Sequence, residues 1–215
     1  MGIKMVLTPL DGYVVLTGDL KSSRKLSERA NVQEQLKSAL KVVNERFDGV
    51  IAAKFIVVGG DGFQGMLSSV EDIFDIYYTL FEMIGHPFYV GIGTGSISTS
   101  LSENVAEMDG EAFHRSSGAL SDTKKKKNWV AFESDLEIDD VITASWNLMA
   151  DTIWNWSERQ KETVLYYRKH GGDREAVKSA STSLDVGERN IYKTLRTGKY
   201  HLLKSVEDAL KEALN

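Results

Sequence analysis

The first 92 residues alternate short apolar runs with longer segments in which apolar residues recur every three or four positions. The longer segments, Val32–Phe47 and Ile73–Ile84, have the spacing of amphipathic helices. The short runs have the length and composition of β-strands, and they span 12–17, 55–58, 63–67 and 88–92. The order strand–helix–strand–strand–helix–strand predicts an α+β fold of the ferredoxin-like type, with the helices on one face of a four-stranded antiparallel sheet.

Turn residues mark the ends of these elements. Ser68 and Ser69 are placed to cap the second helix, and Gly85 is placed to end it. After residue 92 the pattern predicts a helix at 111–121 and a solvated lysine loop at 124–127. A strand at 129–133 and a closing helix at 137–156 are expected to follow. The α+β domain is therefore expected to span 1–136.

Residues 157–215 have a different pattern, with three predicted helices separated by short turns at 158–170, 174–183 and 188–197. Ser157 and Gln160 have the spacing of a capping box at the start of the first helix. In the turn "LDVG", Asp185 stands where left-handed backbone is tolerable. The pattern predicts an all-α helix-turn-helix domain whose last helix contacts DNA. The alternative is a three-helix bundle with a solvated basic face.

The net charge of −5 conceals an uneven distribution. Residues 157–215 contain 12 Lys and Arg against 9 Asp and Glu, whereas residues 1–156 contain 14 against 22. An acidic body with a basic tail favours two functions. The outward side chains of the last predicted helix suit the phosphates and base edges of DNA. The expected DNA-binding residues are Arg189, Asn190, Lys193, Thr194, Arg196 and Lys199.

Composition excludes several classes of site. The chain has no cysteine, which excludes disulfides, thiolate zinc sites and cysteine nucleophiles. No apolar segment approaches membrane-spanning length, and the N-terminus does not resemble a signal peptide. With 42% hydrophobic and 27% charged residues, the sequence is typical of a globular protein. We expect a cytoplasmic protein without a membrane partner.

Two aspartates lie close to predicted strand ends. Asp19 ends the first strand, and Asp61 lies in the turn of the hairpin that follows the second. Because the first and third strands are central neighbours in a split βαβ sheet, both carboxylates are expected at the same end of the sheet. Such a pair suits Mg²⁺ bound together with the phosphates of a nucleotide. The ordinary alternative is an Asp-Gly hairpin turn and an aspartate that caps the next element.

Residues beside the two aspartates are suited to hold phosphates. Glycines in the turn let the backbone approach a ligand closely, and the loop after the first strand offers hydroxyl and basic donors. The expected nucleotide-binding residues are Lys21, Ser22, Ser23, Arg24, Gly60 and Gly62. If a nucleotide binds, a lysine of the run Lys124–Lys127 is a further candidate for a phosphate contact.

Several motifs resemble known families. The hairpin "FIVVGGDGFQGML" is similar to that of class III nucleotidyl cyclases and, less closely, to that of diguanylate cyclases of the GGDEF type. The motifs "GDLKSSRKL", "GGDGFQGML" and "DGEAFHRSSGAL", in this order before a terminal helix-turn-helix, resemble the SatD family over most of the chain. The cyclase resemblance implies that Asp19 and Asp61 bind Mg²⁺ or Mn²⁺ with a nucleotide triphosphate. It also implies a homodimer.

Departures from the cyclase pattern weaken the expectation of catalysis. Enzymes of the GGDEF type have a glutamate where this chain has Gly62, whereas class III cyclases accept a small residue there. Class III cyclases also use an asparagine and, four residues later, an arginine, and the matching positions here are His114 and Gly118. His114 remains a catalytic candidate, with an ordinary half-buried histidine as the favoured alternative.

Three functions follow from these observations. The leading hypothesis is a cytosolic regulator in which a Mg-nucleotide-binding, cyclase-like domain is coupled to a DNA-binding helix-turn-helix. The second is an active metal-dependent nucleotidyl transferase or cyclase, which the missing arginine disfavours. The third is a DNA-binding dimeric scaffold that binds no nucleotide.

Overall fold

The computed structural model describes residues 12–23 and 28–214. Contacts between Cα atoms divide the chain into two compact units. We call Met1–Asn147 with Leu210–Asn215 the α+β unit, and Leu148–Ala209 the helical unit. The boundaries fall inside two helices, α4 (Asp139–Trp154) and α8 (Tyr200–Leu214).

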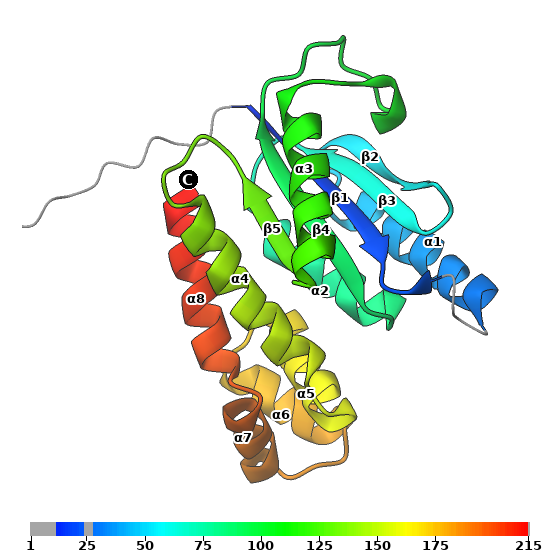
Figure 1. Cartoon of the computed structure of the whole chain (residues 1–215). Coiled ribbons are helices and arrows are strands. Elements are labelled where there is room, and N and C mark those ends of the chain that lie inside the picture. The colour runs from blue at the N-terminus through cyan, green and yellow to red at the C-terminus, as the bar shows by residue number, and fades with distance from the viewer. Residues whose placement is uncertain (1–11, 24–27, 215) are drawn as a thin grey trace, which may run out of the picture. The chain divides into compact units, whose positions relative to one another are not determined.

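The α+β unit contains a five-stranded sheet in the order β2-β3-β1-β4-β5 (Figure 1). Neighbouring strands are antiparallel except β4 and β5, which are parallel. The predicted antiparallel arrangement of the first four strands is present, but the sheet has a fifth strand, because a helical crossover after β4 adds the parallel edge strand β5. The strands are β1 (Tyr13–Leu20), β2 (Ile51–Val58), β3 (Gly62–Leu67), β4 (Phe88–Gly95) and β5 (Val130–Glu133).

Helices cover both faces of this sheet. The two predicted helices, α1 (Arg29–Arg46) and α2 (Ile73–Ile84), pack behind it in Figure 1, and α3 (Glu111–Lys126) packs in front. Side chains from opposite faces of the sheet contact different helices. The ring of Phe88 lies 5.5 Å from that of Tyr77 in α2, centroid to centroid. In contrast, the Thr17 hydroxyl lies 2.9 Å from the Ser116 hydroxyl of α3.

The backbone of α3 lies directly against β4. A Cβ atom at Gly91 would be 2.2 Å from both the Ser116 carbonyl oxygen and the Leu120 nitrogen, so only glycine fits there. The helix extends to Lys126 rather than ending near Ser121, because buried Leu120 and Thr123 continue its inward face. The lysine run is therefore mostly helical, so the predicted loop is wrong, although the four lysines are exposed as expected.

The ends of α2 confirm one prediction and contradict another. Gly85 ends the helix in the left-handed conformation, with φ of 60°, as predicted. The N-cap residue is Asp72, whose side chain makes no capping hydrogen bond. The predicted cap at Ser68 and Ser69 is wrong, since the Ser69 hydroxyl accepts a 3.4 Å hydrogen bond from the Glu71 N–H instead.

The helical unit contains α5 (Glu158–Lys169), α6 (Arg174–Ser183) and α7 (Glu188–Thr197) around a shared apolar core. The capping box at Ser157 and Gln160 is present, and Asp185 has φ of 51°, as predicted. Helix α8 was not predicted, although its buried Leu203, Leu210 and Leu214 have helical spacing. No helix among the residues that the structure describes is long and apolar enough to cross a membrane.

Candidate functional site

The two aspartates lie at the same end of neighbouring strands, as the topology predicts. In the β1–β3 register, Asp19 is opposite Gly62, the residue after Asp61. The Leu20 N–H donates a 3.0 Å hydrogen bond to the Asp61 carbonyl, which fixes the turn against β1. Asp19 lies inside β1 rather than after it, so its carboxylate is held by a regular strand.

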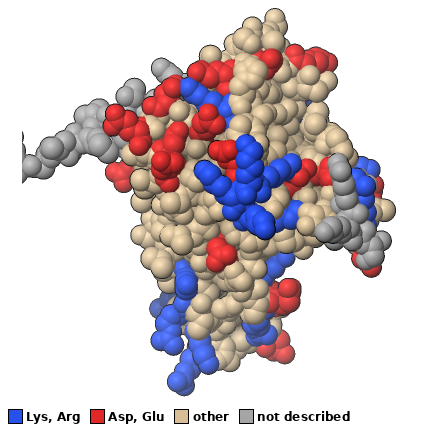
Figure 2. Space-filling model, viewed as in Figure 1, with Lys and Arg blue, Asp and Glu red and all other residues tan. Residues whose placement is uncertain are grey.

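The Asp19 carboxylate forms an ion pair with Lys124, with 2.8 Å between Oδ2 and Nζ. The last turn of α3 brings Lys124 to the end of β1, where 25% of the Asp19 side chain remains exposed. The neighbouring Lys125 and Lys126 face Asp122 at 3.5 and 3.9 Å. Figure 2 shows Lys and Arg side chains gathered over the C-terminal half of α3 with acidic groups beside them.

Lys21 contacts aromatic rings in this structure. Its Nζ lies 3.2 Å from the centroid of the Trp129 ring and 4.4 Å from that of Tyr89, which are cation–π distances. Tyr89 is the register partner of Asp19, so the rings lie beside the aspartate. The backbone of Lys21 is also fixed, because its N–H donates to the Pro87 carbonyl at 2.8 Å.

The two serines of the loop after β1 differ in environment. Ser23 is only 4% exposed, and its hydroxyl donates a hydrogen bond to the Asp61 carboxylate. Ser22 is exposed and has φ of 54°, an uncommon conformation for a residue with a side chain. Arg24, another predicted phosphate ligand, lies outside the described residues.

The glycines of the hairpin turn are required by its geometry. Gly60 has φ of 89°, and its carbonyl accepts a 2.5 Å hydrogen bond from the Gln33 side chain of α1. A Cβ atom at Gly62 would lie 2.9 Å from the Val58 carbonyl oxygen and 3.1 Å from that of Gly18. Both glycines therefore allow the close backbone approach that places Asp61 next to β1.

His114 is not close to the aspartates. It precedes Lys124 by ten residues on α3, which corresponds to about 15 Å along a helix. Its side chain is 76% exposed and its Nε2 is 3.5 Å from Oδ1 of Asp109, so the expected half-buried histidine is wrong. At Gly118, a Cβ atom would lie 3.2 Å from a carboxylate oxygen of Glu133. The position that matches the cyclase arginine thus faces an acid.

Arg115, the residue after His114, forms ion pairs and a hydrogen bond away from the two aspartates. Its guanidinium donates to the Thr94 carbonyl at 2.7 Å and forms ion pairs with Asp135 and Glu111 at 2.5 and 2.8 Å. Burial alone would lower the pKa of Arg115, but the hydrogen bonds to Asp135 and the nearby acidic charges outweigh burial and raise it. Arg115 therefore has a structural role in joining α3 to the strand ends.

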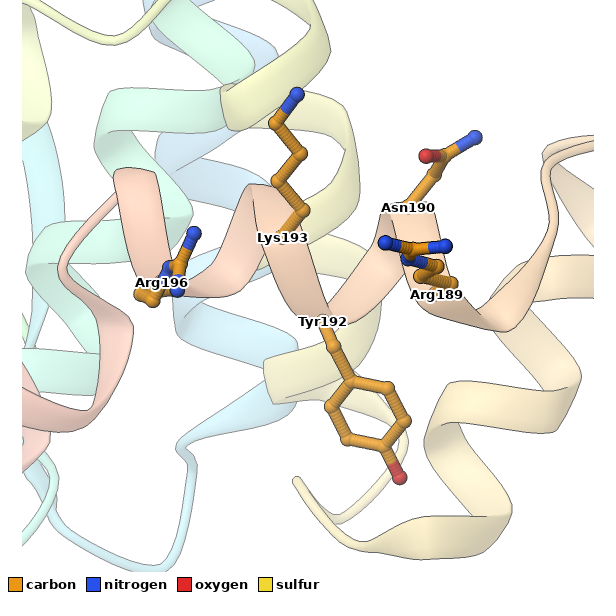
Figure 3. A pocket seen from close by; sticks show the side chains of 5 residues that line it. All are labelled: Arg189, Asn190, Tyr192, Lys193 and Arg196. Atoms are coloured by element: carbon orange, nitrogen blue, oxygen red, sulfur yellow. The ribbon is translucent and has the colours of Figure 1, made fainter.

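The outer face of α7 forms a second candidate site. Ile191 and Leu195 are buried on the inner face, which leaves the opposite side chains in solvent. Figure 3 shows five side chains projecting from α7, with Tyr192 on the other side of the helix from Lys193. They line an open depression of ≈ 610 Å³. These residues are Arg189, Asn190, Tyr192, Lys193 and Arg196.

The remaining predicted DNA contacts are less prominent. Thr194 is half-buried, and Lys199 is exposed just after α7 with φ of 59°. Tyr192, which is 49% exposed, is not among the predicted DNA contacts. Its position three residues after Arg189 and four before Arg196 was a signal that it shares their face.

The basic groups on this face have no acidic partner. Within the described part of the chain, no carboxylate lies within 4.0 Å of the charged groups of Arg189, Lys193 or Arg196. Other basic residues of the helical unit are paired. Lys178 lies 2.7 Å from Glu175, Lys204 pairs with Asp208, and Arg168 with Glu207. In Figure 2, Lys and Arg side chains are prominent where α7 reaches the surface.

Comparison with solved structures finds distant similarities. One is to the structure of a bacterial light-regulated adenylyl cyclase, with 13% identity over 56% of this chain and 74% of that one, and a TM-score of 0.43. Another is to the catalytic core of a rhodopsin-guanylyl cyclase with converted specificity, in complex with ATPαS. Here the identity is 14% over 52% of this chain and 72% of that one, with a TM-score of 0.36. No curated protein gives a significant match.

The family comparison is more extensive. The model of the SatD family matches residues 13–200, which include both the aspartate pair and α7. The resemblance seen in the three short motifs is therefore confirmed over most of the chain, and the protein belongs to the SatD family.

Proposed function

We propose that this protein binds DNA through α7 and binds a Mg²⁺–nucleotide through its α+β unit. The observation that supports DNA binding most directly is the set of unpaired basic groups on the exposed face of α7. A cation with no carboxylate partner is free to contact a phosphate, and its counterions are released when it does so. Binding at this face requires no internal ion pair to break.

The arrangement of α6 and α7 suits a helix-turn-helix. The two helices are joined by a turn of four residues, Leu184–Gly187, and α7 is anchored by Ile191 and Leu195. In such motifs the second helix enters the major groove. Arg189 and Asn190 in its first turn are then placed for base edges, whereas Lys193 and Arg196 are suited to phosphates.

The test is the affinity for duplex DNA, measured by fluorescence anisotropy over a range of salt concentrations. The variant Arg189→Ala/Lys193→Ala/Arg196→Ala should bind more weakly, and its salt slope should fall by about one for each phosphate contact removed. The matched control is Lys178→Ala/Lys204→Ala, which removes two paired lysines from the same unit. Equal affinity and slope in wild type and the α7 variant would exclude this face as the DNA-binding surface.

The proposal for the α+β unit rests on the position of Asp19 and Asp61 at the same end of neighbouring strands. The described residues contain no group of three or more His, Cys, Asp or Glu that is able to hold a metal. Two carboxylates nevertheless suit Mg²⁺, which commonly binds through one or two carboxylates and takes further oxygens from substrate phosphates and water. Lys124 beside Asp19 adds positive charge for those phosphates.

Nucleotide binding is better supported than turnover. The positions that match the cyclase asparagine and arginine are an exposed histidine remote from the aspartates and a glycine facing Glu133. Charge that develops on phosphates in a transition state would lack that arginine. The bound metal ion would supply charge neutralisation for the phosphates, and Asp19 and Asp61 would position it.

The test is thermal melting with ATP, GTP, CTP and UTP, each with and without Mg²⁺. A ligand at 100 times its dissociation constant should add about 2.7 kcal/mol to the unfolding free energy. Asp19→Asn and Asp61→Asn should abolish the Mg²⁺-dependent shift, whereas the exposed control Asp48→Asn should retain it. A shift that survives both site variants would place the nucleotide elsewhere.

A two-fold dimer would complete this function. It would present two copies of α7 to paired half-sites about one helical turn of DNA apart. A nucleotide changes DNA affinity only if it binds more tightly to one of two states of the protein. Light scattering and DNA titrations with and without Mg²⁺–nucleotide measure both properties, and an unchanged DNA affinity would show that the two sites are independent.

A further inference from the structure

The rings of Tyr89 and Trp129 lie beside the aspartate site, and the chain itself occupies them. The Lys21 ammonium is 3.2 Å from the Trp129 centroid and 4.4 Å from the Tyr89 centroid. Tyr89 is directly across from Asp19 in the β1–β4 register. Both aromatic side chains are half-buried, so each retains surface that faces solvent.

The backbone of Trp129 is fixed from two directions. Its N–H donates a 2.7 Å hydrogen bond to the Asn147 side chain, and its carbonyl accepts a 2.9 Å hydrogen bond from the Val90 N–H. The ring is thus attached to a rigid position at the edge of the sheet. Little backbone freedom of Trp129 remains to be lost when a ligand packs against its ring, which favours affinity.

The same ring surface suits two kinds of ligand. The face of an aromatic ring attracts a cation, and it also stacks against a nucleobase. A lysine ammonium is strongly hydrated in water, so a ligand is able to compete with it for such a face. Two rings beside a carboxylate and a second lysine match the parts of a nucleotide: a flat base, anionic phosphates and their metal ion.

We infer that Tyr89 and Trp129 form the base-stacking subsite of the nucleotide site, and that the base replaces the Lys21 ammonium on these rings. The inference rests on the proposed Mg²⁺–nucleotide function, since Asp19 and Asp61 locate the phosphate end. The exchange releases Lys21 two residues from Asp19, where its charge is available to a phosphate. The expected ligand class is nucleoside triphosphates, with preference for the larger ring of a purine.

The test compares a ligand that has a base with one that has only phosphates. Titration calorimetry on the full chain measures the affinity for ATP and for inorganic tripolyphosphate, both with Mg²⁺. Trp129→Leu should weaken ATP binding by about 5- to 150-fold, the range for one aromatic–base stack, and change tripolyphosphate affinity by less than about twofold. The control is Tyr13→Leu, a half-buried aromatic at the opposite end of β1, which should leave both affinities unchanged.

Three outcomes are distinguishable. If wild type binds neither ligand, the proposed nucleotide function fails, and this inference fails with it. If wild type binds ATP and tripolyphosphate equally, or if Trp129→Leu weakens both alike, only the base subsite is overturned, and the ring pair serves to position Lys21 and its loop. Tyr89→Leu is judged by the same criterion if Trp129→Leu does not give a native melting transition.

Discussion

The α+β unit and the outer face of α7 differ in how their cations are neutralised. In the α+β unit, Lys124 pairs with Asp19 at 2.8 Å, Arg115 with Asp135 at 2.5 Å, and Lys54 with Glu103 at 3.0 Å. On the outer face of α7, Arg189, Lys193 and Arg196 have no such partner among the described residues. Similar side chains are therefore engaged in ion pairs in the α+β unit and available on the outer face of α7.

This difference predicts two modes of anion binding. A phosphate that meets α7 finds free cations, so its binding should depend mainly on salt concentration. A phosphate that enters the aspartate site must compete for cations that already have partners, so its binding should depend on a metal ion that takes over the carboxylates. Variants that remove one member of a pair test this distinction.

The largest expected effect comes from the buried ion pair of the helical unit. Arg168 and Glu207 are 2.8 Å apart, with side chains 11% and 1% exposed. Glu207→Ala leaves a mostly buried guanidinium without its carboxylate and should lower the unfolding free energy by about 3–5 kcal/mol, measured by urea denaturation. The double variant Arg168→Met/Glu207→Leu removes both charges and should lose far less. A loss below about 1 kcal/mol in Glu207→Ala would show that the pair is effectively solvated.

The next effect tests how tightly α3 is packed above the aspartate site. Gly91→Ala places a Cβ atom 2.2 Å from the Ser116 carbonyl oxygen. Helix α3 must move away from β4 to relieve this clash. We expect a loss of about 1–3 kcal/mol or more in thermal or urea unfolding. At Gly49 no atom lies within 4 Å of an added Cβ, so Gly49→Ala is the matched control. Equal stability of the two variants would contradict the close packing of α3 on β4.

A smaller effect should follow from freeing Asp19. Lys124→Met keeps much of the side-chain length but removes the ammonium that neutralises the carboxylate. Exposed ion pairs are worth about 0.2–1 kcal/mol, so the affinity for Mg²⁺ alone should rise by up to about fivefold in calorimetry. Lys125→Met removes a neighbouring lysine that faces Asp122 and should have no effect. An affinity that falls in Lys124→Met would show that the lysine assists the metal rather than competing with it.

The smallest effect concerns Asp72, whose pKa is raised even though Lys211 and Arg46 act to lower it. Burial raises the pKa of Asp72 above 3.8, and the charges of Asp75 and Glu71 raise it further. A raised pKa means that ionisation destabilises the folded state, so this penalty is absent below pH 3.8 and grows as the pH rises through the folded-state pKa. Asp72→Asn should therefore be a few tenths of a kcal/mol more stable than wild type at pH 7, on the order of other surface substitutions. Melting curves from pH 3 to 7 should show this advantage vanishing at the acidic end, and an advantage independent of pH would contradict the assignment.

Local pattern predicted much of the secondary structure. The predicted bounds of α6 and α7 agree with the structure, because a capping aspartate and a tight turn mark their ends in the sequence. Strand β1 extends to Leu20, beyond its predicted end at Thr17. The prediction is too short because Gly18 interrupts the apolar run on which it depends. That glycine is required by packing, since a Cβ atom there would lie 2.1 Å from the Phe63 ring. The edge position of β5 was not predictable from periodicity, because it depends on how α3 crosses the sheet.

The site was predictable where topology alone determines it. Strand order placed Asp19 and Asp61 together, and the register confirms this. The partners of the long side chains were not predictable, because lysines contact whichever group lies near them in three dimensions. Lys21 contacts the ring of Tyr89 in β4 and that of Trp129 just before β5, and Lys124 reaches Asp19 across more than a hundred residues of sequence.

The central position of β1 also determines when the sheet is able to form. Tyr13 at its start pairs with Gly95 at the end of β4, so β1 has only one of its two neighbours until the chain has been synthesised past residue 95. Such long-range pairing slows folding, whereas helices in local contact fold in about microseconds to milliseconds. We therefore expect α5 to α7, although synthesised after the sheet, to reach native structure rapidly, while the first strand leaves an unpaired edge that a nascent chain must protect from aggregation.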